Sequence, residues 1–152
     1  MQPPAARSCR RSSIARAIVA ILSGGAEQAD LAARIDAAKP PLYVSPTATF
    51  ETVLSLAAKV ARQTGATLDA TLVTAAQQIV TEFLADLGVK DIMITAEIGR
   101  KAIEAAKHYS KAVGHPAALN FGDCFAYACA RAYRVPILFQ GNDFSRTDIK
   151  VA

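Results

Sequence analysis

The 152-residue chain lacks long apolar runs, and stretches such as Ala17–Leu22 are far shorter than the roughly 18 residues that a membrane-spanning helix needs. It also has few cysteines. Cys9, Cys124 and Cys129 cannot all pair, and no two of them form a Cys-x-x-Cys motif, so neither a disulfide framework nor a zinc site is indicated. We therefore expect a cytoplasmic protein with reduced thiols and no membrane segment, in which Cys124 and Cys129 belong to the core.

Acidic residues are absent before Glu27, whereas Arg7, Arg10, Arg11 and Arg16 all lie in that stretch. The other 13 of the 17 basic residues equal the 13 acidic residues in number, so the formal net charge of +4 arises from the N-terminal stretch alone. The rest of the chain is formally neutral. A basic face for nucleic acid would therefore depend on how the fold arranges its charges.

Helical and strand-like segments alternate along most of the chain. Apolar residues at helical spacing, with capping residues and breakers at the ends, predict helices over residues 26–39, 46–63, 67–87, 95–113 and 120–134. Short apolar runs predict strands over residues 42–45, 89–94 and 135–139, and a last short strand over 149–151. Strands of this length separated by helices are typical of an α/β domain with a short parallel sheet flanked by helices.

Three acidic residues fall where such a fold would gather them at one edge of the sheet. Glu51 lies in the second turn of the helix that follows the first strand, and Asp123 is the third residue of the helix that begins near Asn120. Asp143 belongs to a Gly-Asn-Asp turn that follows the strand over 135–139. Carboxylates that converge in this way offer the oxygen ligands that Mg²⁺ or Mn²⁺ prefers.

Each of these acids also has a simpler explanation. Glu51 could be one solvated helix acid among several, and Asp143 could be an ordinary turn residue. Asp123 could be half of a capping pair with Asn120. Taken one at a time, the three residues do not decide between a metal site and these structural roles.

Four segments of the chain resemble one protein family. They are AIVAIL (17–22), YVSPTATFETVLSL (43–56), HPAALNFGDCFAYACARA (115–132) and VPILFQGNDFSRTDI (135–149). Together they are similar to the PIN-domain ribonuclease toxins of the VapC type. The resemblance implies a three-layer PIN-like fold and a Mg²⁺- or Mn²⁺-dependent endoribonuclease that acts on RNA as the toxin of a toxin–antitoxin pair. It also implies a homodimer that a VapB-like antitoxin neutralises.

The same resemblance assigns roles to individual residues. Glu51, Asp123 and Asp143 match the second, third and fourth acids of the family, so they are the expected catalytic and metal-ligating residues. Asp148 occupies a further acidic position, to which we give less weight. The first acid of the family pattern falls on Ile14, which cannot bind a metal ion.

The N-terminal stretch departs from the family in a second way, because RSCRRSS (7–13) does not form the apolar strand expected there. Two interpretations stay open. Residues 1–16 are an atypical segment, disordered or belonging to a misassigned start, joined to a PIN domain over 17–152, or the protein is a true degenerate member. Both predict strongly reduced metal affinity and activity, since one ligand is missing. The alternative function is a non-catalytic protein that dimerises and captures antitoxin.

Two further groups of side chains have alternative roles. Basic residues near the acidic motif could meet RNA phosphates or be solvated: Arg131, Arg134, Arg146 and Lys150. Apolar residues of the helix over 67–87 could face a partner, although the core is the simpler expectation: Leu72, Ile79, Val80 and Phe83.

Overall fold

The computed structural model describes residues 13–150, with side chains from residue 15 onward. Its helices are α1 (Ser13–Leu22), α2 (Gln28–Ala37), α3 (Pro46–Thr64), α4 (Ala70–Asp86), α5 (Ala96–Tyr109) and α6 (Phe121–Tyr133), with the short 3-10 helices η1 (Lys111–Val113) and η2 (Phe144–Arg146). Its strands are β1 (Tyr43–Val44) and β2 (Lys90–Asp91), which pair in parallel with Tyr43 opposite Lys90. Cys9 and Ile14, the residue at the first acidic position of the family pattern, lie outside the residues whose side chains the structure describes.

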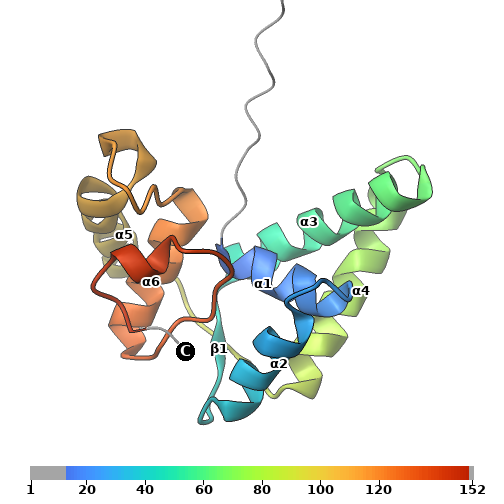
Figure 1. Cartoon of the computed structure of the whole chain (residues 1–152), viewed down its shortest axis with the longest axis horizontal. Coiled ribbons are helices and arrows are strands. Elements are labelled where there is room, and N and C mark those ends of the chain that lie inside the picture. The colour runs from blue at the N-terminus through green and yellow to red at the C-terminus, as the bar shows by residue number, and fades with distance from the viewer. Residues whose placement is uncertain (1–12, 151–152) are drawn as a thin grey trace, which may run out of the picture.

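The helices form two groups, one on each side of the short sheet (Figure 1). On one side α1 packs against α2 and α3, and α3 packs against α4, around buried residues such as Leu31, Ala57 and Val80. On the other side α5 and α6 pack together with the C-terminal segment, around buried residues such as Leu119 and Phe144. This arrangement confirms the predicted α/β fold with a short parallel sheet between helical layers.

The helix boundaries follow from capping residues that the sequence shows. The Ser45 side chain accepts a hydrogen bond from the backbone of Ala48, and Pro46 opens α3. Gly65 ends that helix in the left-handed region, at φ 71°. Thr95 caps α5 in the same way as Ser45 caps α3. The predicted positions of these helix starts are therefore confirmed.

Three boundaries differ from the prediction. The helix expected over 67–87 begins only at Ala70, because Asp69 caps it by accepting a hydrogen bond from the Leu72 backbone. The helix expected over 95–113 stops at Tyr109, and η1 follows as a separate turn. The helix expected over 26–39 is shorter at both ends and spans Gln28–Ala37.

The predicted strand over 135–139 is wrong within the part of the chain that the structure describes. The Ile137 N–H donates a hydrogen bond to the Lys150 carbonyl at 3.0 Å, but residues 135–139 form no strand. The strand expected over 89–94 is reduced to Lys90–Asp91. A strand needs a hydrogen-bonding edge beside it, and β propensity alone does not supply one. The strand expected over 149–151 lies partly outside the described residues.

The burial of the apolar side chains shows which of them belong to the core. Val80 is fully buried and Leu72 and Phe83 are half-buried, whereas Ile79 is 46% exposed. Cys124 and Cys129 lie in the core as predicted, and burial raises the pKa of each thiol to about 11. None of the helices within residues 13–150 is both long enough and apolar enough to cross a membrane.

Phe144 anchors the segment that carries Asp143. Its side chain is fully buried and meets the edge of the Phe139 ring, with 5.2 Å between the ring centroids. We predict that Phe144→Ala lowers the free energy of unfolding by about 3–5 kcal/mol, because it leaves a cavity in the core. The control Phe121→Ala, at a side chain that is 69% exposed, should cost less than about 1 kcal/mol. The measurement is urea denaturation. Equal losses of unfolding free energy in the two variants would contradict the anchoring role of Phe144.

Candidate metal and active site

Asp123 is fixed at the N-terminus of α6 and is only 1% exposed. One of its carboxylate oxygens accepts a hydrogen bond from the Asn120 N–H at 3.2 Å, and the Asn120 side chain accepts one from the Asp123 N–H at 2.9 Å. This reciprocal pair is a capping box, so the structural role considered for Asp123 is present. The helix dipole favours a negative charge at this position as well.

Glu51 lies against the same end of α6. It projects from α3, which packs on α6, and its carboxylate lies directly over Gly122. A Cβ atom at position 122 would come within 2.5 Å of Glu51 Oε1 and 2.6 Å of Oε2. Only a residue without a side chain allows this approach, so Gly122 determines where the Glu51 carboxylate lies. Two acidic side chains therefore meet the first turn of α6.

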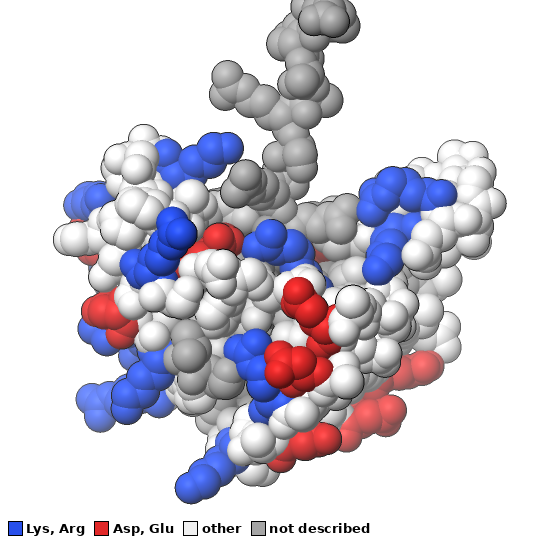
Figure 2. All heavy atoms as spheres, viewed as in Figure 1, with Lys and Arg blue, Asp and Glu red and all other residues white. Residues whose placement is uncertain are grey.

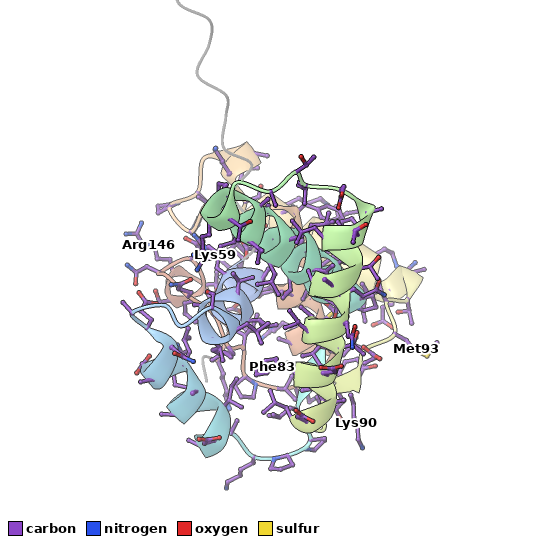
Figure 3. All side chains as sticks on the ribbon, turned by 90° about the vertical axis from the view of Figure 1, so that its right-hand side faces the viewer. Lys59, Phe83, Lys90, Met93 and Arg146 are labelled. Carbon is purple, nitrogen blue, oxygen red and sulfur yellow. The ribbon has the colours of Figure 1, made fainter. Side chains whose placement is uncertain are left out.

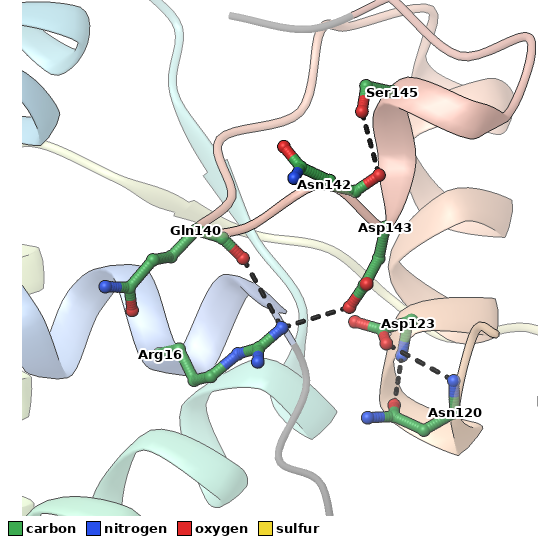
Figure 4. Close-up of polar contacts among 7 residues, drawn as sticks. All are labelled: Arg16, Asn120, Asp123, Gln140, Asn142, Asp143 and Ser145. Atoms are coloured by element: carbon green, nitrogen blue, oxygen red, sulfur yellow. Dashed lines mark hydrogen bonds and ion pairs between the residues drawn. The ribbon is translucent and has the colours of Figure 1, made fainter. Parts of the chain in front are cut away.

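Asp143 comes to the site from the C-terminal segment. In Figure 4 its side chain points toward that of Asp123, and Arg16 reaches it from α1. The Arg16 guanidinium donates to Asp143 Oδ2 at 3.0 Å and to the Gln140 carbonyl at 3.4 Å (Figure 4). The structure thus brings the predicted acids toward one place, and it adds a cation there.

The sequence pattern alone does not predict Arg16 as a site residue. The available signal was its position, a charged residue between Ala15 and the apolar run over 17–22. The side chain is about one-third exposed, and so is that of Asp143. A charge pair that is partly removed from water is stronger than one on an open surface. Arg16 therefore supplies positive charge where the family resemblance implies a metal ion.

Asp148 lies in a separate set of contacts. Its carboxylate accepts a hydrogen bond from the Tyr127 hydroxyl, and Arg131 approaches it at 3.8 Å. The hydrogen bond and the nearby guanidinium hold the pKa of Asp148 below its ordinary value. Burial and the same hydrogen bond raise the pKa of Tyr127. These contacts tie α6 to the C-terminal segment, which gives Asp148 a structural role.

Two of the basic residues considered for RNA binding have partners within the chain. Arg131 pairs with Asp148, and the Arg146 guanidinium donates to the Pro116 carbonyl at 3.2 Å. On the face drawn in Figure 2, basic side chains are interrupted by uncharged and acidic ones, and acids gather over α2 and α4. The side chains that the structure describes form no continuous basic surface on this face.

A basic hollow lies beside Arg16 instead. It has a volume of about 480 Å³ and is lined by Arg16, Val19, Ala20, Gly25, Lys59, Arg62, Gln63 and Gln140. Lys59 projects from α3 (Figure 3). Its Nζ donates to Ser23 Oγ, just after the end of α1, at 2.6 Å. No acidic side chain lines the hollow. The sequence did not single out Lys59 or Arg62, because their position beside Arg16 depends on how α1 packs against α3.

The described side chains do not form a complete site for a divalent cation. Among residues 13–150, no three His, Cys, Asp or Glu side chains are placed so that they could hold a metal ion. One oxygen of Asp123 is used in the capping box, and one oxygen of Asp143 is bound to Arg16. The metal-binding role of Glu51, Asp123 and Asp143 stays a prediction, and the arrangement is the physical reason to expect weak metal affinity.

Comparison with known proteins identifies a family and several relatives. The family described as PIN domain matches residues 15–150. A VapC ribonuclease of Rhizobium meliloti (strain 1021) is 38% identical over 133 residues, which is 87% of this chain and 94% of that protein. Ribonuclease VapC36 of Mycobacterium tuberculosis is 33% identical over 135 residues, or 88% of this chain and 87% of the relative. Ribonuclease VapC42 of the same species is 40% identical over 75 residues, or 49% and 57%.

The contact between Glu51 and Gly122 can be tested by a double-mutant cycle. We predict that Gly122→Ala changes the free energy of unfolding by less than about 0.5 kcal/mol, because the gain in helix propensity is offset by moving the Glu51 carboxylate, the end of a flexible side chain, away from the new methyl group. In a Glu51→Ala background the same substitution should instead stabilise the protein by about 0.5–1 kcal/mol, since alanine is the better helix former. An equal effect of Gly122→Ala in both backgrounds, measured in urea, would show that the contact is absent.

Arg16 can be tested through metal affinity. We predict that Arg16→Gln tightens Mn²⁺ binding by about tenfold or more, because it removes a positive charge that repels the cation. The matched control is Arg131→Gln, which breaks the ion pair with Asp148 and should leave Mn²⁺ binding unchanged. The measurement is calorimetric titration of the purified variants with Mn²⁺. Identical Mn²⁺ affinity in the native protein and Arg16→Gln would refute the prediction.

Proposed function

The chain belongs to the PIN domain family, and from that premise we propose that it is a VapC-type endoribonuclease toxin with impaired activity. The observation that carries the proposal is the position of the acids beside the basic hollow. Arg16 contacts Asp143 and also lines the hollow with Lys59 and Arg62. An RNA backbone that occupied the hollow would therefore present its phosphodiesters to the acids.

In this proposal the residues of the chain divide into two groups. Lys59 and Arg62 bind phosphate groups next to the scissile bond, where their charges offset the charge of the backbone. Glu51, Asp123 and Asp143 are the catalytic acids, and they remain the proposed ligands of the Mg²⁺ or Mn²⁺ that the family resemblance implies. Activity is impaired because Arg16 holds Asp143 and because the first acid is replaced at Ile14.

A second candidate is a non-catalytic toxin that captures a VapB-like antitoxin. The observation in its favour is the same ion pair between Arg16 and Asp143, which opposes metal binding. An exposed apolar patch offers a surface for a partner. Phe50 and Leu54 lie one turn apart on α3 and are 64% and 40% exposed. A VapB-like antitoxin, a homodimer and a cytoplasmic location are part of both candidates.

RNA cleavage by the purified chain separates the two candidates. With Mn²⁺ or Mg²⁺ present, we predict weak cleavage of a structured RNA that EDTA and Asp123→Asn both abolish. The double variant Ile14→Asp, Arg16→Ser should cleave about 10- to 100-fold faster, since it restores an acid and removes the cation. Arg62→Gln should raise the RNA concentration needed for half-maximal rate without removing activity.

Two results would decide against the nuclease. Cleavage that survives both EDTA and Asp123→Asn would not come from this site. If neither the native chain nor the double variant cleaves RNA, while the native chain still binds antitoxin in a pull-down, the function is antitoxin capture and not RNA cleavage.

A further inference from the structure

The aromatic ring of Phe121 is exposed at the beginning of α6. Phe121 is the first residue of this helix, and its side chain is 69% exposed. The ring packs on that of Phe125, one turn later, with 4.9 Å between the ring centroids and 49° between the ring planes. Phe125 is itself half-buried and packs against the core. Phe121 therefore has a supported ring, of which a large part is open to solvent.

This ring lies at the edge of the acidic site. The next residue, Gly122, lies under the Glu51 carboxylate, and Asp123 follows it. The capping box between Asn120 and Asp123 fixes the backbone on both sides of Phe121. A helix rises by about 1.5 Å per residue, so Phe121 is within one turn of the acid on its own helix. The ring therefore projects from the same rigid turn that carries Asp123 and contacts Glu51.

The charges of the site separate this ring from the basic hollow. In Figure 4, Asp143 lies between Arg16, which lines the hollow, and the turn that holds Asn120 and Asp123. Phosphate groups are negatively charged, so they favour the hollow and are repelled on the side of the acids. A nucleobase is flat and uncharged, so it can lie beside carboxylates on an aromatic ring. The charge pattern thus favours a base, and not a phosphate, at Phe121.

We propose that Phe121 stacks an unpaired base of the RNA next to the scissile phosphodiester. The open part of the ring takes one face of the base, as aromatic side chains do in proteins that bind single-stranded RNA. Bases inside a double helix are stacked on one another, so the ring selects unpaired nucleotides, such as those of a loop. This inference rests on the proposed nuclease function for the position of the scissile bond, but base binding can be measured without cleavage.

Binding of a fluorescein-labelled oligouridylate in EDTA tests the stacking, because EDTA prevents metal-dependent cleavage. The comparison RNA is a labelled ribose-phosphate chain of the same length that lacks bases. By fluorescence anisotropy, we expect the native chain to bind the oligouridylate about fivefold or more tightly than the abasic chain. Phe121→Leu keeps an apolar side chain but lacks the flat ring, so it should lose most of this preference. Phe121→Trp should retain the preference.

The matched control is Tyr133→Leu, at the opposite end of the same helix. Tyr133 is the last residue of α6, is 38% exposed and packs on Tyr43, with 5.1 Å between the ring centroids. It lies roughly 18 Å along the helix from Phe121. Tyr133→Leu should therefore keep the native preference for the oligouridylate. Circular dichroism checks that each variant folds.

Three results overturn the proposal. Equal affinity of the native chain for the two RNAs, or no saturable binding of either, would show that no base is stacked. An equal loss of affinity for both RNAs in Phe121→Leu would give the ring a structural role only. If Phe121→Leu keeps the preference but converts a dimer into monomers in light scattering, the ring belongs to an interface between protein chains. The nuclease proposal fails on different evidence, the absence of cleavage by both the native chain and the double variant.

Discussion

The ion pair between Arg16 and Asp143 decides what the acidic site of this protein can hold. Carboxylates that are brought together at a helix terminus require positive charge nearby, and a divalent cation is the usual source in a nuclease site. Here a guanidinium at 3.0 Å from Asp143 contributes that charge from within the chain. A metal ion must then compete with a partner that is covalently attached and always charged.

Helix α1 connects this ion pair to the rest of the structure. Arg16 lines the basic hollow, and Ile18, two residues later, lines an apolar cavity beside β1. Residues at this spacing point to nearly opposite sides of a helix, so one helix separates a charged site from an apolar one. The Phe139–Asp143 segment adds to the connection, because Arg34 binds its Phe139 carbonyl and Arg16 binds its Gln140 carbonyl.

Local chemistry made much of the fold predictable. Ser45-Pro46, Thr95 and Asn120 each mark a helix start, and the structure places a helix after each of them, because a cap acts within one turn. The prediction of a strand over 135–139 was wrong, because it rested on composition alone. The aliphatic residues of this segment favour a strand, but pairing depends on a neighbour that sequence does not reveal, and the β1 side of this segment borders a cavity.

The candidate site also has one part that local sequence predicts and another part that depends on tertiary packing. The sequence predicted Glu51, Asp123 and Asp143 as the acids of the site, and it also offered the capping role of Asp123, a local contact that the structure confirms. It did not reveal that Arg16 meets Asp143, because the two are 127 residues apart and a long flexible side chain has no sequence periodicity. The Gly122 contact was missed for the same reason, since it depends on how α3 packs on α6.

The most direct test is crystallographic, with anomalous scattering from Mn²⁺. Crystals of the native chain grown with Mn²⁺ should show only a weak anomalous peak between Asp123 and Asp143, with the Arg16 guanidinium in place. Crystals of Ile14→Asp, Arg16→Ser should show a peak there. A Mn²⁺ peak that both carboxylates share in the native chain, with Arg16 displaced, would contradict the claim that the protein's own cation blocks the site.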